Sequence, residues 1–354
     1  MERLLASEID EVELFFRDEN RLKVGVNNGV VKDVVVEDFR GLGVRVLRNG
    51  VLAFSYTTDF SELGLGTLQE RLETMLDSSV RDPFYRFAEP AKVPDIDLML
   101  IDDSLEETFS LSEMAKELES SALKVEGVES VPLCEVASGR ETVFIMNSLG
   151  VEVGYARSIL SQIISACAQE ASPDRAPLCF NFSRRRSELI SPKALGEECG
   201  KLAVSLSRAG SFPSGERAVI FSPQAASDLV VFLEQALSGE AVVKGGSFLR
   251  NWLDSKVASE LVTLREEPHI PGAYHSSLVD AEGVPTSSKV VIHGGVLKCF
   301  LHNLYSSGKL GAAPTGNAGR AGYSSPPGVA TYNLFVEPGG ASGGTAPEEM
   351  LREV

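Results

Sequence analysis

The sequence lacks the features of a secreted, membrane-spanning or nucleic-acid-binding protein. No run among its 354 residues approaches the roughly 20 apolar residues that a membrane helix needs. The acidic stretch Met1–Glu8 has no apolar core of the kind found in a signal peptide. The net charge is −17, whereas nucleic acids and anionic membranes require a cationic face. These absences predict a cytoplasmic protein with no nucleic-acid or membrane partner.

Cysteine is scarce, and its spacing matches neither a metal site nor a disulfide framework. The five cysteines are isolated and odd in number, and no Cys-x-x-Cys pair occurs. The pattern therefore predicts neither structural zinc nor disulfides, and it favours a reducing compartment. The five positions are Cys134, Cys167, Cys179, Cys199 and Cys299.

Common catalytic and nucleotide-binding motifs are also missing. There is no Walker loop and no Gly-x-Ser-x-Gly elbow. Gly41-Leu-Gly43 lacks the third glycine of a dinucleotide-binding turn, and a strand pattern follows it. His269 and His275 flank a proline-glycine loop without an evident third ligand, so a metal site there is the weaker interpretation. The run Arg184-Arg185-Arg186 is interpreted as a solvated loop.

The chain divides into three regions, 1–80, 95–212 and 216–354, and a proline-rich stretch over 82–97 predicts a linker between the first two. In the first region, Asn28-Gly29 and Asn49-Gly50 each separate two β-rich segments. Asn-Gly favours type I′ turns, so two hairpins are predicted. Apolar residues at helical spacing then predict a helix: Leu68, Leu72, Met75 and Leu76.

The second and third regions mix helices with hairpins. In the second, a capping pattern at Ser110–Glu113 predicts one helix and Ser191-Pro192 begins another, while strands are expected over 128–136, 142–147 and 151–158. In the third, a strand over 218–221 and a helix over 222–238 precede strand and turn signals up to Val336. The glycine-rich stretch 339–345 predicts a flexible tail. Without a βαβ rhythm, the chain is predicted to be α+β with a β-rich C-terminal domain.

Two polar turns flank an apolar hairpin pattern, 290–301, in the third region. Asp280–Thr286 places two carboxylates beside a glycine and a proline, and Thr315–Arg320 combines small polar residues with an arginine. Polar turns on a strand scaffold often carry binding groups, although they can equally be ordinary loops. In a strand Asp280 and Glu282 would share one face. The glycine and proline that follow favour a turn instead.

Taken in order, several motifs resemble those of the TldD/PmbA family, whose members are called modulators of DNA gyrase and are treated as peptidases. The resemblance implies the family's α+β fold with a mixed sheet. It also implies cleavage of unfolded peptides or protein leaders, including peptide maturation. Direct action on gyrase is disfavoured by the net charge of −17. The motifs are Gly41–Arg45, Ile145–Val151, Gly245–Leu249, Asp280–Thr286, Thr315–Arg320 and Thr331–Leu334.

The chain departs from the family's catalytic branch at one helix. Catalytic members carry His-Glu-x-x-x-His there, with two zinc-binding histidines and a glutamate as general base. Val231-Phe-Leu-Glu-Gln-Ala236 stands at that place, and Glu234 is its only carboxylate. The resemblance therefore implies the PmbA (TldE) branch, with no catalytic residue, metal or cofactor in this chain. Zinc is expected in a TldD-like partner.

The resemblance also implies a substrate cavity and a subunit partner. The partner is a TldD-like chain in a heterodimer, or a second copy in a homodimer, and the substrate is an unfolded peptide. Family members usually continue beyond the equivalent of Val354, which predicts a different closure, a covering partner or a fragment. The alternative functions are a self-associating peptide- or ligand-binding scaffold and, less favoured, a peptidase with a metal site at His269 and His275. The cavity candidates are Asp280, Glu282, Gly283, Thr286, Thr315, Asn317 and Arg320.

Overall fold

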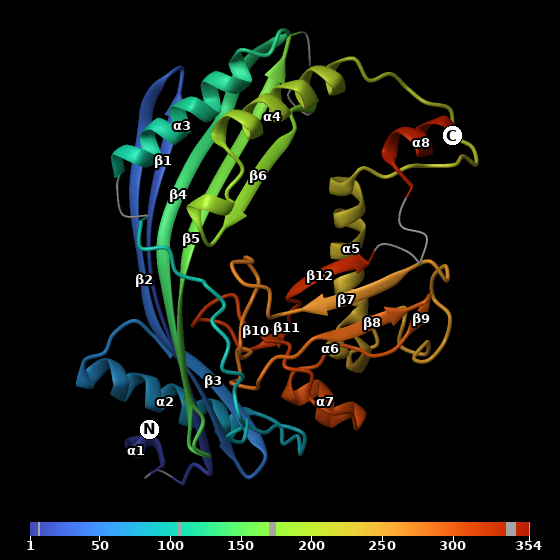
Figure 1. Ribbon diagram of the computed structural model, residues 1–354. Helices are drawn as coiled ribbons and strands as arrows, with labels where there is room; N and C mark the ends of the chain where they lie inside the picture. The colour runs from blue at the N-terminus through green and yellow to red at the C-terminus, as the bar shows by residue number, and fades with distance from the viewer. Residues whose placement is uncertain (6–7, 105–107, 170–174, 338–344, 354) are drawn as a thin grey trace.

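The computed structural model describes residues 1–5, 8–104, 108–169, 175–337 and 345–353. Its largest element is a six-stranded antiparallel sheet of long, curved strands in the order β3-β2-β1-β4-β5-β6 (Figure 1). Because β1 pairs with β4, the regions 1–80 and 95–212 contribute to one continuous sheet. The strands are β1 (Glu11–Asn27), β2 (Val30–Arg48), β3 (Val51–Thr57), β4 (Val128–Asn147), β5 (Glu152–Ala168) and β6 (Leu178–Ser183).

Both predicted Asn-Gly hairpins are confirmed. Asn27 pairs with Val30 and Arg48 with Val51, which leaves two-residue turns between the strands. Asn28 and Gly29 have φ angles of 53° and 75°, and the second turn has similar values. Positive φ at both central positions is what a type I′ turn requires, and asparagine and glycine tolerate it.

Strand alternation gives the large sheet two different faces. On β1, Val12 packs with the helix α2 (Glu62–Ser78), and Val24 packs with α3 (Thr108–Leu123) and α4 (Pro192–Ser207). The side chains of the odd-numbered residues of β1, which alternate with Val12 and Val24, point to the opposite face of the sheet. Among them Phe15 packs against Ala281 and Ala318 from the C-terminal third. Helices therefore cover one face, and the C-terminal third covers part of the other.

Some predicted elements differ from those observed. β4 continues through 137–141, where a break between two strands was expected, because Gly139 serves a close contact rather than a turn. A Cβ at Gly139 would lie 2.2 Å from the carbonyl oxygen of Asn20 on β1. α3 begins at Thr108, before the predicted cap, whereas Ser191 caps α4 as expected by accepting from the N–H of Ala194. The helix predicted around Leu72 is confirmed as α2.

The C-terminal third contains a four-stranded antiparallel sheet, β12-β7-β8-β9, and a small ladder of β10 and β11. The helix predicted over 222–238 is confirmed, but the segment 218–221 is not a strand, and α6 and α7 were not foreseen. The predicted flexible tail lies almost wholly outside the described residues. The elements are α5 (Pro223–Leu237), α6 (Gly239–Val243), β7 (Thr263–Glu267), β8 (Lys289–His293), β9 (Val296–Leu297), α7 (Leu304–Leu310), β10 (Ala318–Gly319), β11 (Gly328–Val329), β12 (Asn333–Glu337) and α8 (Pro347–Glu353), and the N-terminus forms the short α1 (Glu2–Leu5).

The predicted linker continues as an extended segment that contacts both parts of the molecule. Leu98 accepts a hydrogen bond from Gly272 of the C-terminal third at 2.7 Å, and Leu100 accepts one from Ser158 of β5 at 2.8 Å. The fold is α+β, as predicted. None of the helices in the described part of the chain is long and apolar enough to cross a membrane.

Candidate functional site

The structure brings the two predicted polar loops together. Asp280 forms the predicted turn: its Oδ1 accepts from the N–H groups of Glu282 and Val284 at 2.8 and 2.9 Å. Its Oδ2 accepts from the N–H of Ala318 in the second loop at 3.0 Å. Burial raises the pKa of Asp280 to about 7, the charge of Glu282 acts in the same direction, and the three N–H donors oppose them.

Beside this turn lies a buried cluster of two arginines and two glutamates, which we call the four-charge cluster: Glu13 on β1, Arg45 on β2, and Glu282 and Arg320 on the two loops. Arg45 donates to Glu13 through Nε at 2.8 Å and to Glu282 through Nη1 at 2.9 Å. Arg320 also pairs with Glu13. Burial opposes the ionised form of Glu13, but the neighbouring Arg45 and Arg320 outweigh it and lower the pKa of Glu13. The cluster therefore joins the large sheet to the C-terminal third.

Four other predicted residues support the loops from within. Thr286 donates to the carbonyl of Ser277 at 2.6 Å and contacts the ring of His269 at 2.9 Å. Thr315 makes hydrogen bonds with the backbone of His302, and Asn317 donates to Glu266 at 2.8 Å. Gly283 has a φ angle of 81°, and a Cβ there would lie 2.7 Å from the side chain of Val151. Of the seven candidates, Arg320 alone lines either of the two cavities between the large sheet and the C-terminal third.

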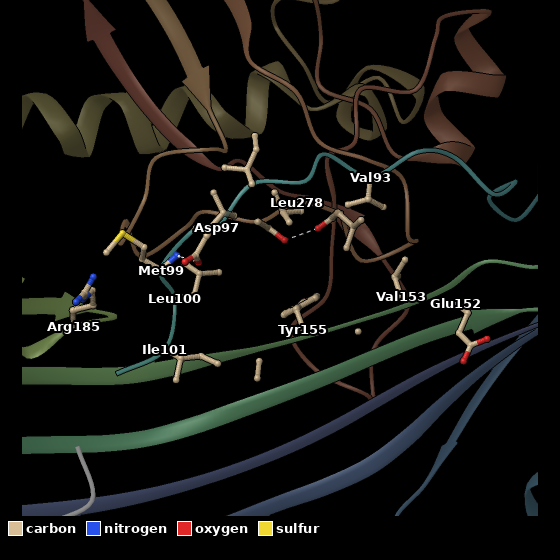
Figure 2. Close-up of a pocket in the computed structure, with 16 residues that line it drawn as sticks. Val93, Asp97, Met99, Leu100, Ile101, Glu152, Val153, Tyr155, Arg185 and Leu278 are labelled. Carbon is tan, nitrogen blue, oxygen red and sulfur yellow. Dashed lines mark hydrogen bonds between the residues drawn. The ribbon is translucent and has the colours of Figure 1, made fainter. Parts of the chain in front are cut away.

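A groove of about 740 Å³ runs between the linker, β5 and the C-terminal third (Figure 2). Apolar side chains of the linker form one wall, including Ile96, Leu98 and Met99. Figure 2 shows Glu152 and Arg185 toward opposite ends of this groove, with Tyr155 between them. The arrangement offers an elongated, largely apolar surface with a charged residue toward each end and Asp97 between them, whose Oδ1 accepts from the N–H of Met99 at 2.8 Å.

The floor of the groove is an open edge of β5. β6 pairs only with Leu160–Ser165, so among the residues that the structure describes the earlier part of β5 has no neighbouring strand on that side. The N–H of Ser158 already bonds outward to the linker. Because outward-facing backbone groups alternate along an antiparallel strand, Gly154 and Ala156 present theirs to the groove. An extended chain in the groove could therefore pair with β5 as an additional strand.

A second cavity of about 430 Å³ adjoins the groove, and Tyr155, Ser277 and Val279 line both. We call it the polar cavity. It lies between the sheet face that carries Phe15 and the two polar loops. Its charged lining residues are Arg17, Glu141, Arg157 and Arg320.

The charged residues that the sheet contributes to this cavity were not predicted from the sequence. Glu19 on β1 lies directly opposite Glu141 on β4, a repulsive arrangement unless a cation intervenes. Arg17 supplies that cation by pairing with both, at 2.5 and 2.6 Å, and Arg157 pairs with Glu141 from the other side. The sequence does contain a pattern that could have indicated them. Alternate residues of β1, on the face turned away from the helices, are mostly charged: Glu13, Phe15, Arg17, Glu19 and Arg21.

The interpretation of Arg184-Arg185-Arg186 as a solvated loop was wrong for its first member. Arg184 is buried and donates to the backbone carbonyls of Tyr274 and Ser158 at 2.6–2.9 Å. Its guanidinium also lies 4.0 Å from the centre of the Tyr274 ring. A sequence run of like charges could not indicate this, because the partners are carbonyls 90 and 26 positions away.

The helix α5 does not present a set of metal ligands. Val231 and Phe232 are exposed and Ala236 is buried. Glu234 accepts a hydrogen bond from Thr331 at 2.5 Å, and burial raises the pKa of its carboxyl. Across the described residues, no three His, Cys, Asp or Glu side chains are grouped as metal ligands. His269 instead contacts Thr286, and His275 lines the polar cavity.

Comparison with known proteins gives consistent matches. Three family models match successive parts of the chain: PmbA/TldA metallopeptidase domain 1 over 12–81, the central domain over 100–207 and the C-terminal domain over 214–354. The chain is 25% identical to metalloprotease PmbA of Escherichia coli O157:H7, covering 99% of this chain and 76% of that protein. It is 28% identical to a metalloprotease of Methanothermobacter thermautotrophicus, covering 90% and 69% respectively.

Two solved structures share the fold over nearly the whole chain. A Thermotoga maritima protein named for modulation of a DNA gyrase superposes with a TM-score of 0.83 at 26% identity, covering 99% of this chain and 79% of that one. TldE from Thermococcus kodakarensis superposes with a TM-score of 0.78 at 20% identity, with the same coverage. At 20% identity, the similarity to TldE is evidence of a shared fold only.

The four-charge cluster predicts a large effect of Arg45→Met on stability. The substitution leaves Glu282 buried without its ion-pair partner and Glu13 with only Arg320. Removing one partner of a buried ion pair costs about 3–5 kcal/mol, so the free energy of unfolding should fall by that order in urea titrations. Arg40→Met on the same strand is the matched control, because Arg40 pairs with Asp18 at the surface. Equal destabilisation by both variants would contradict a special role for the cluster.

The pKa of Asp280 predicts a pH dependence of stability. An unfolded Asp loses its proton near pH 3.9, whereas Asp280 in the folded chain keeps it to about pH 7. The unfolded state therefore binds fewer protons between these values, and the free energy of unfolding falls as the pH rises from about 4 to about 7, by up to about 1.4 kcal/mol per unit. Asp280→Asn should flatten this slope in urea titrations, and an unchanged slope would assign it to other groups.

Proposed function

The chain belongs to the PmbA/TldD family, and we propose that it is a subunit of a metallopeptidase complex that cleaves unfolded peptides or protein leaders. The chain holds an extended peptide in the groove beside β5, and a TldD-like partner hydrolyses it. The open edge of β5 within an apolar groove is the observation that carries this proposal. Folded proteins already pair their backbone groups internally, so an open edge selects unfolded segments.

Zinc does not fit the residues of α5, and we propose that the partner holds it. Zinc requires nitrogen, sulfur or oxygen donors at fixed geometry. Val231, Phe232 and Ala236 have no such side-chain atom, and Glu234 is a single carboxylate already bonded to Thr331. No catalytic step is therefore assigned to this chain, whose contribution is to bind and orient the peptide.

Subunit assembly is supported by an unpaired edge of the large sheet. β3 pairs only with Leu42–Arg48, so the earlier half of β2 has no neighbouring strand on that side within the described part of the chain. Exposed apolar edges of this kind commonly mark interfaces. The partner is a TldD-like chain, or a second copy of this one, and the site of action is the cytoplasm, in keeping with five free cysteines. The exposed side chains on this half are Val30, Val34, Val35, Val36 and Phe39.

The proposed division of labour can be tested with unfolded fluorogenic peptides. The purified chain alone should release no product, and adding a TldD-like subunit from the same source should produce zinc-dependent cleavage. A TldD-like subunit whose zinc-motif glutamate is replaced by glutamine is the matched control and should remain inactive in the mixture. Zinc-dependent cleavage by the chain alone would overturn the proposal. Stable self-association with no complex on mixing would favour the scaffold alternative.

Binding by strand addition predicts sensitivity to backbone methylation of the peptide. An N-methyl group on alternate residues removes the N–H donors that face β5 while leaving the side chains unchanged. Such a peptide should bind the chain at least about tenfold more weakly than its unmethylated form, because two or more backbone hydrogen bonds are lost. Methylation on the other alternate set is the control and should have a smaller effect. Equal affinity for all three peptides, measured by calorimetry, would contradict strand pairing.

A further inference from the structure

The polar cavity next to the groove carries an excess of positive charge that the chain itself does not neutralise. On this face of the sheet, Arg17 and Arg157 pair with Glu141, near which Arg184 also lies, and Arg17 and Arg21 pair with Glu19. Arg21 also lies opposite Glu37 on β2. The four-charge cluster on the other side of the cavity is balanced, with two carboxylates for two guanidinium groups. In a chain with a net charge of −17, a local excess of buried and half-buried arginine requires an explanation.

The pKa of the Arg184 guanidinium agrees with this local excess of positive charge. Burial, followed by repulsion from Arg157, lowers the pKa of Arg184 to about 10. Desolvation is the larger cause of this shift, and the repulsion shows that the Arg184 and Arg157 guanidinium groups lie close enough to oppose each other's charge. An anion entering the cavity would supply the missing charge.

Hydrogen-bond donors also remain unused around the cavity. The Arg320 side chain is almost completely buried, yet its Nη1 has no hydrogen-bond partner among the described residues. Arg157 pairs with Glu141 through Nε, and neither of its Nη groups bonds to any residue that the structure describes. The buried Nη1 of Arg320 is unfavourable without an acceptor, which indicates a ligand with acceptor oxygens. The Arg157 side chain is 25% exposed, so its Nη groups are accessible to such a ligand. Guanidinium groups match carboxylates in charge and geometry.

The cavity and the groove adjoin each other, since Tyr155, Ser277 and Val279 line both. We propose that the polar cavity binds a carboxylate of the peptide held in the groove, with Arg157 and Arg320 as its donors. The carboxylate comes from the peptide's C-terminus or from an aspartate or glutamate side chain. This inference rests on the proposed peptide-binding function and adds a substrate class to it: apolar peptides with a carboxylate at a defined position.

The test compares peptides that differ only in one charge. The probes are Ala-Val-Leu-Val-Ala with a free C-terminal carboxylate, the same peptide as its amide, and two further amides in which the central leucine is glutamate or glutamine. All carry the same neutral fluorophore at the N-terminus. A charge-assisted hydrogen bond should make the carboxylate form bind the full-length chain about ten- to a hundredfold more tightly. A preference for the free acid identifies the C-terminus as the source, and a preference for glutamate over glutamine identifies a side chain.

Two variants distinguish carboxylate binding in the polar cavity from a general effect of the protein's charge. Arg157→Gln should abolish the carboxylate preference, while Glu141 keeps Arg17 as its partner and the sheet stays paired. Arg40→Gln removes the same charge from the opposite face of the sheet and should retain the preference, since Arg40 pairs with Asp18, which alternates with Arg17 and Glu19. Circular dichroism of both variants checks the fold.

The outcomes distinguish the two proposals. Equal binding of charged and uncharged peptides by the unsubstituted chain would overturn the carboxylate site but leave the peptide groove intact. A carboxylate preference that survives Arg157→Gln would also overturn the assignment of this cavity. If none of the four peptides binds, both the groove function and the carboxylate site fail.

Discussion

The ion pairs of Arg45 with Glu13 and Glu282 fix the position of the C-terminal third relative to the large sheet, the two halves of this molecule. It joins neighbouring strands of the large sheet to a loop of the C-terminal third, and Arg320 completes the arrangement from the second loop. A buried ion pair requires close geometry, because desolvation of each charge opposes it. The groove and the polar cavity both lie between these halves, so their shapes depend on this cluster.

One face of the large sheet serves mainly stability, and the other serves mainly binding. The helix-covered face is packed with aliphatic residues such as Leu118, Leu160 and Ile164. The other face carries arginines and glutamates that pair across β1, β4 and β5. Charged residues are costly at buried positions unless they are paired, so their concentration on one face indicates a function beyond packing. The adjoining open edge of β5 combines backbone pairing groups with an apolar wall, which suits an extended peptide.

Sequence reasoning worked best where the signal was local. The Asn-Gly pairs predicted both hairpins, and the Asp280 turn was favoured over a strand because Gly283 and Pro285 follow it. It failed where distant contacts decide the structure. The stretch between the strands predicted over 128–136 and 142–147 is part of β4, where Gly139 lies against the backbone of Asn20. Arg184 was interpreted as part of a solvated loop but binds carbonyls of distant segments. Of the seven residues predicted to line a cavity, Arg320 does so. The buried carboxylates, Asp280 and Glu282, instead join the loops and the two halves.

The α+β class, the hairpin turns, the family and the lack of a full set of zinc ligands over 231–236 follow from the sequence alone. These depend on residue identity and on neighbours close along the chain. The packing of the whole chain determines which face of β1 meets the C-terminal third, that β6 leaves part of β5 open, and that arginines gather around Glu19 and Glu141 on one face. Those features depend on pairings between strands more than a hundred residues apart, such as Glu19 opposite Glu141. Side-chain alternation restricts such pairings, but packing of the whole molecule selects among them.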